Sequence, residues 1–240
     1  MSSTSTVEAA LLDKLHSTMN RVESKTTELH NSIDGKLHWI PGPLRSPIVA
    51  GWNKFCSLMD RIWQNFNTMV STMGSPGQVW DTADAWSDRV GVPVSSQVQT
   101  AETGMLSVDD NWDGDAADAY RQMLPLQKTA LDKIKSTISD GVSSVLKDVA
   151  MGILVFWAGL IAALLALVVG LIGAICSSAT IVGLPAAPFI ASGAALICSA
   201  SMITGAEILK GVCSSANATL RQKFDNTGFH EGHWPPAVKT

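Results

Sequence analysis

Apolar residues recur at helical spacing in two stretches of the first 75 residues, separated by the proline-rich segment 38–47 (HWIPGPLRSP). Positions three and four apart fall on one face of an α-helix. We therefore expect an antiparallel helical hairpin over residues 1–75, with the first helix ending at Gly35 and the second beginning with Ser46 as N-cap and Pro47 as first helical residue. The two stripes are Leu11, Leu15, Thr18, Val22, Thr26, Leu29, Ile33 and Trp52, Phe55, Met59, Ile62, Phe66, Met69, Met73.

Residues 76–148 predict a second helical hairpin. Its first helix should falter at Gly91-Val92-Pro93, because proline cannot donate an interior hydrogen bond. The second, starting at Asp115, contains Pro125 and should be bent. Acidic residues dominate between Asp81 and Asp118. This face either attracts basic partners or is simply solvated.

Charge then disappears from the chain, since no Asp, Glu, Lys or Arg occurs between Asp148 and Glu207. The run from Met151 to Cys176 reaches about 39 Å as a helix, which exceeds a hydrocarbon core of ~30 Å. A second apolar run follows at 189–209, after a loop with glycine and proline. We expect a two-helix transmembrane hairpin over residues 149–210 and a polar, flexible tail over 211–240. A helix pair buried in a soluble core is the alternative.

Small residues stand four apart on both apolar runs. Such stripes allow two helices to approach closely in lipid, although Ala and Gly are also simply common in membrane helices. Basic residues flank both runs and are missing from the loop, so conventional insertion places both termini in the cytosol. A protein that is exported first and inserts from outside does not follow this rule. The stripes are Ala158, Ala162, Ala166, Gly170, Ala174 and Ala187, Ala191, Ala195, Ser199.

Composition narrows the chemistry further. The net charge of -4 and a pI near 5.7 provide no basic footprint for nucleic acid. The sequence contains no nucleophile elbow, phosphate-binding glycine loop or HExxH motif, so we predict no enzyme, no catalytic residues and no cofactor. His230 and His233 lie in a polar tail, where solvated residues are favoured over a metal site. The four cysteines have no zinc-site spacing and are expected to be small apolar fillers.

The stretch LSVDDNWDGDAADAY, residues 106–120, contains a Trp112-Asp113-Gly114 turn followed by small residues and Tyr120. Gly114 permits a tight reversal, Asp113 or Asp115 can cap the next helix, and Trp112 can fold back over the hairpin end. The pattern resembles the WXG-type proteins of type VII (ESX-type) secretion over about residues 77–148. The resemblance implies an all-α hairpin that pairs with a similar partner. The family's export signal, tyrosine followed four residues later by an acid, is absent, since Leu124 holds the fourth position.

These observations favour a WXG-like membrane protein associated with type VII secretion, an effector or toxin-related protein that inserts its apolar hairpin into a bilayer. Its expected partners are lipid and either a WXG-type protein or further copies of itself. Its expected location is the bacterial cell membrane, or a membrane entered after secretion. Hydroxyls on the second apolar helix and Glu207 suit a pore lumen, or bond back to their own helix. The alternative function is a membrane-anchored helical scaffold without pore activity.

Overall fold

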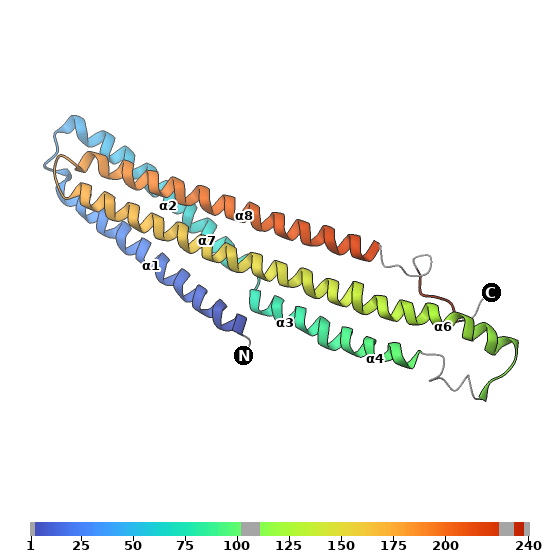
Figure 1. Cartoon of the computed structure of the whole chain (residues 1–240). Coiled ribbons are helices and arrows are strands. Elements are labelled where there is room, and N and C mark those ends of the chain that lie inside the picture. Colours follow the sequence, from blue (N-terminus) through green and yellow to red (C-terminus); the bar gives the residue numbers. More distant parts are fainter. Residues whose placement is uncertain (1–2, 102–110, 226–232, 238–240) are drawn as a thin grey trace. The chain divides into compact units, whose positions relative to one another are not determined.

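The computed structural model describes residues 3–101, 111–225 and 233–237 (Figure 1). The described residues form helices and contain no strand, so the all-α prediction is confirmed. In chain order the elements are α1 (Ser3–Leu37), α2 (Gly42–Thr72), α3 (Pro76–Trp86), the π-helix η1 (Ser87–Gly91), α4 (Val92–Thr100), α6 (Asp115–Lys133), the π-helix η3 (Ile134–Ser139), α7 (Asp140–Ser178), the 3-10 helix η4 (Leu184–Ala186) and α8 (Ala187–Asp225).

The helices form two compact units. The first unit contains the chain up to Ser75 together with Gly152–Gly211, and the second contains Pro76–Met151 together with the chain from Val212. α7 and α8 therefore contribute to both units. The predicted domain 1–75 and residues 152–210 of the predicted domain 149–210 lie together in the first unit, whereas the sequence pattern predicts two separate domains.

α1 and α2 are antiparallel in the first unit, as predicted. The centroids of the His16 ring, early in α1, and the Phe66 ring, late in α2, are 6.5 Å apart. At the other end of the pair, the His30 and Trp52 rings are 5.1 Å apart. Apolar stripe residues of both helices are buried between these contacts: Leu15, Val22, Leu29, Phe55 and Ile62.

The end of α1 differs from the prediction. The helix passes through Gly35 and ends at Leu37. Gly35 does not have a positive φ, so it is not the left-handed C-cap that the sequence favours. The chain turns instead through backbone bonds from Trp39 N–H to Lys36 O at 3.0 Å and from Ile40 N–H to Leu37 O at 3.2 Å.

The start of α2 also differs. The helix begins at Gly42, and both Ser46 and Pro47 lie inside it, so the predicted N-cap is wrong. Pro43 and Pro47 are both compatible with the first turn of a helix. The chain uses Pro43, which directly follows the first helical residue Gly42. Arg45 explains part of this choice, since its Nε donates to Ile40 O at 2.7 Å and satisfies a carbonyl of the connecting turn.

The expected break at Gly91-Val92-Pro93 is absent. The chain continues from α3 to α4 through the π-helix η1, and the Val92 N–H donates to Ser87 O. The wider π turn shifts the hydrogen-bond pattern by one residue just before Pro93, which has no N–H to contribute. Pro125 likewise lies inside the continuous helix α6. Proline therefore interrupts neither helix.

Candidate functional site

The apolar hairpin is the part of the first unit formed by α7 from Gly152, by η4 and by α8 as far as Gly211. Among the described residues, the helices that carry it are the two that are long and apolar enough to cross a membrane. Its α7 arm buries mainly large residues, and its α8 arm buries mainly small ones. The large buried residues on α7 are Ile153, Phe156, Trp157, Leu160, Ile161, Leu164, Leu167, Val168 and Leu171, beside Ala163, Ala174 and Ser178, and the buried residues on α8 are Ala187, Pro188, Ala191, Ser192, Ala195, Cys198 and Met202.

The apolar hairpin also exposes much of its apolar surface. A core helix of a soluble protein is mostly buried, whereas only 39% of the most apolar stretch of each of these helices is buried. At the hairpin tip, Val182 is 92% exposed. A large exposed apolar surface marks a site of membrane or protein contact. The large exposed residues include Val155, Val169, Phe189, Ile190, Leu196, Ile197, Ile203 and Ile208.

The two arms approach each other closely at Gly170. A Cβ atom added there would lie 2.3 Å from the Ala194 Cβ, so only glycine fits. Of the other predicted packing residues, Ala174, Ala191 and Ala195 are buried and Ser199 is half-buried. By contrast, Ala158, Ala162 and Ala166 are exposed, because the large side chains of α7 fill its contact face. Close packing is therefore confined to part of the predicted stripe.

α1 and α2 contact the apolar hairpin directly. A Cβ added to the buried Gly51 of α2 would lie 3.1 Å from the Pro188 Cβ, and the Ser192 hydroxyl donates to Gly51 O at 3.4 Å. At the end of α7, Ser32 and Lys36 of α1 contact the buried Ser178. Neither Gly51 nor Ser178 is among the packing residues predicted from the sequence.

A signal for this second contact is present in the sequence. The apolar face of α2 is wider than the stripe that faces α1. It also includes Ile48, Gly51 and Leu58, which lie three or four residues from Phe55 or Ile62 of that stripe or from one another, and all five are buried. One partner helix needs only a narrow a/d seam, whereas a wider apolar face indicates a second neighbour.

In the second unit, the Trp112-Asp113-Gly114 segment adopts a turn that requires glycine. Gly114 has φ 105° and ψ 176°, a region that is essentially restricted to glycine. The Trp112 and Tyr120 rings lie 5.8 Å apart. Arg121 Nη2 donates to Trp112 O at 2.9 Å, and its Nη1 pairs with an Asp118 carboxylate at 2.9 Å. These contacts fasten the turn to the first two turns of α6.

Capping of α6 differs from the prediction. Gly114 itself is the N-cap residue, and no side chain caps the helix, so neither Asp113 nor Asp115 has that role. Asp115 and Asp118 lie in the first turn, where a negative charge is favourable near the positive end of the helix dipole.

The helices on either side of the turn pack together with opposite directions. α4 contacts α6, and the two π-helices η1 and η3 contact each other. At that contact the buried Ser139 hydroxyl donates to Trp86 O at 2.7 Å. Further along, Lys147 Nζ lies 2.8 Å from an Asp84 carboxylate and 5.7 Å from the Trp80 ring centroid.

The described residues contain no group of three or more His, Cys, Asp or Glu side chains placed to hold a metal ion. His230 and Glu231 of the tail lie outside the described residues. The cysteines are free. Cys198 is buried as expected of an apolar filler, whereas Cys176 and Cys213 are exposed and do not fill a core. Burial, followed by the nearby Asp60 carboxylate, raises the pKa of the half-buried Cys56 thiol.

No protein-family model, curated protein or solved structure matches the chain.

Proposed function

We propose that this protein is a WXG-like helical protein associated with type VII secretion that inserts its apolar hairpin into a membrane. The observation that carries the proposal is the exposed apolar surface on two helices of membrane-spanning length. At about 25 cal/mol per Å² of apolar surface removed from water, transfer of such a surface into lipid is strongly favourable. The hairpin carries no charged residue from Gly152 to Ala206, so no buried charge opposes the transfer.

The association with type VII secretion rests on the turn motif. The glycine-only conformation of Gly114 and the contact between Trp112 and Tyr120 give these residues a structural role of the kind that the resemblance implies. Trp112 is 42% exposed, which leaves it available to a partner. A second WXG-type protein is the partner that we propose for this surface.

A second copy of the chain is the partner that we propose within the membrane. Ala158, Ala162 and Ala166 lie along an exposed face of α7 at the four-residue spacing that favours close packing of helices in lipid. Ser201, Thr204 and Glu207 of α8 are exposed as well and suit a polar lumen in such an oligomer. A static scaffold anchored by the same hairpin remains the alternative.

Vesicles loaded with a fluorescent dye test the proposal and its alternative. The purified protein is added to vesicles of phosphatidylcholine and phosphatidylglycerol at neutral and acidic pH, and binding by flotation is measured alongside dye release. An Ile197→Lys variant places a charge on the exposed apolar surface and should reduce binding. Thr27→Lys, on the polar surface of α1, is the matched control and should bind normally. Binding without release supports the scaffold, and no binding at all refutes membrane insertion.

A further inference from the structure

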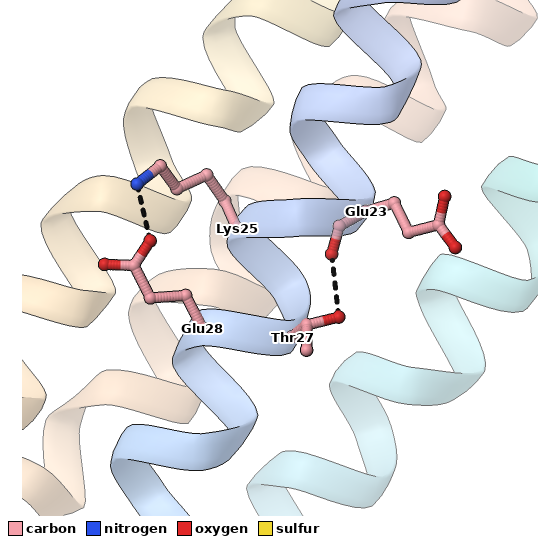
Figure 2. A network of polar contacts seen from close by, with 4 residues as sticks. All are labelled: Glu23, Lys25, Thr27 and Glu28. Carbon is pink, nitrogen blue, oxygen red and sulfur yellow. Dashed lines mark hydrogen bonds and ion pairs between the residues drawn. The ribbon is translucent and has the colours of Figure 1, made fainter.

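The outer surface of α1 and α2 is rich in charged groups. Figure 2 shows part of it on α1, where Lys25 pairs with Glu28 and the Thr27 hydroxyl donates to Glu23 O. Charged side chains are strongly disfavoured in hydrocarbon, so α1 and α2 cannot enter a bilayer beside the apolar hairpin. The exposed charged residues of the pair include Asp13, Lys14, Arg21, Glu23, Glu28, Asp34, Lys54, Asp60 and Arg61.

Two polar contacts join α1 to the apolar hairpin at the hairpin tip. The Ser32 and Ser178 hydroxyl oxygens are 2.7 Å apart, and Lys36 Nζ donates to Ser178 O at 2.7 Å. The α1–α2 connection and the α7–α8 loop accordingly lie at the same end of the first unit (Figure 1). The tip is the part of a hairpin that must cross a bilayer first. The contacts of Ser32 and Lys36 therefore attach α1 to the segment that has to enter the membrane.

We infer that α1 and α2 form a detachable cover, which must separate from the apolar hairpin before the hairpin can span a membrane. The inference rests on the proposed function and adds a conformational step to it. In the closed state seen here, the exposed apolar surface of α7 and α8 can lie on the membrane while the charged cover faces water. In the open state, the face released by the cover contacts lipid.

A reversible cross-link provides the test. In a full-length background with all four cysteines replaced by alanine, Ser32→Cys and Ser178→Cys are introduced together. A disulfide between them locks the cover onto the tip, and a reductant releases it. The readout is the fraction of vesicle-bound protein that resists extraction at alkaline pH, with equimolar phosphatidylcholine and phosphatidylglycerol. The two single variants, oxidised in the same way, are the controls.

We expect the oxidised double variant to bind vesicles but to lose its extraction-resistant fraction, and the reductant to restore it. Equal resistance of the oxidised and reduced forms would overturn the inference while leaving membrane insertion intact. If the reduced form and the background protein both fail to resist extraction, the proposed function fails and the inference falls with it.

Substitution of a contact glycine gives a second test with the opposite sign. Gly51→Leu forces a side chain against Pro188 and Phe189 and should separate the cover, whereas Gly42 of the same helix has open space around it. Gly51→Leu should therefore insert faster than the unaltered protein, and Gly42→Leu should insert at the same rate. Slower or unchanged insertion of Gly51→Leu, in a protein that still binds vesicles, would contradict a cover that has to detach.

Discussion

Replacement of Gly114 by alanine tests whether the turn before α6 has the backbone conformation described above. A Cβ added at this position meets no atom within 4 Å, so the substitution creates no clash. The whole effect should come from the backbone, because φ 105° with ψ 176° is a conformation that L-residues with a side chain rarely adopt. We expect Gly114→Ala to destabilise the turn by about 1–3 kcal/mol.

Gly35 provides the matched control. It lies inside α1, also with open space around it, and its φ is not positive. The same substitution there should be stabilising by about 0.5–1 kcal/mol, because alanine restricts the unfolded chain more than glycine and favours a helix. Two identical substitutions are therefore expected to have effects of opposite sign.

The assay is hydrogen exchange of the full-length protein, read at the amides of the first two turns of α6, with thermal unfolding as a global measurement. Gly114→Ala should speed exchange at Ala117 and Asp118, whose amide donates to Gly114 O at 3.1 Å. A global unfolding transition would fall by about 2–4 °C for each kcal/mol lost. If Gly114→Ala exchanges like the unaltered protein while Gly35→Ala is stabilised as expected, Gly114 does not have this conformation and the reasoning is refuted.

Three further predictions concern residues of the first unit. Phe66→Ala should lower the free energy of unfolding by about 3–5 kcal/mol in chemical denaturation, because it empties a buried site between α1 and α2; a loss below about 0.5 kcal/mol would place this stripe at a surface. Gly170→Ala should destabilise the apolar hairpin in detergent by about 1–3 kcal/mol. Adding Ala194→Gly should restore stability, because the clash is between these two residues. If the double variant is as unstable as Gly170→Ala, residues 170 and 194 are not in contact. Cys56 should react more slowly with iodoacetamide than an exposed thiol, and its rate should increase as pH rises. Asp60→Asn should speed the reaction, because it removes the charge that helps to raise the Cys56 pKa. An unchanged rate in Asp60→Asn would contradict an effect of Asp60 on the Cys56 thiol.

The pairing of α1 with α2 could be predicted because each helix repeats its apolar positions over many turns. Such a repeat places the apolar side chains on one face of the helix, and this face is buried when two helices pack together. The apolar runs of α7 and α8 were equally visible, since charge disappears from nearly sixty residues between Asp148 and Glu207. Periodicity also locates the second apolar stripe of α2 around Gly51, but it does not say which helix fills it. The contacts of Gly51 with Pro188 and Ser192 identify that neighbour as α8.

Helix ends and local breaks were the weakest predictions, because several residues compete for each role. In isolation Gly35 is a good helix terminator and Pro47 a good first helical residue, yet α1 ends two residues later at Leu37 and α2 already begins at Gly42. The π-helix before Pro93 has no periodic signature, since it depends on the packing of η1 against η3. Ala158, Ala162 and Ala166 were predicted to lie in the contact between α7 and α8 but are exposed. The large apolar residues of α7 occupy its contact face instead, and the spacing of the small residues alone does not reveal this.

Access to the hairpin tip tests the central claim most directly. Val182, at the tip, is replaced by cysteine in a background that keeps only Cys213 of the native cysteines, and both residues are exposed in the structure. A thiol reagent that cannot cross membranes is added outside vesicles carrying the protein, with and without detergent. If the apolar hairpin spans the bilayer from one side, Cys213 is labelled in both conditions and the tip only after detergent is added. Labelling of the tip from outside intact vesicles, at the rate seen in detergent, would contradict membrane insertion.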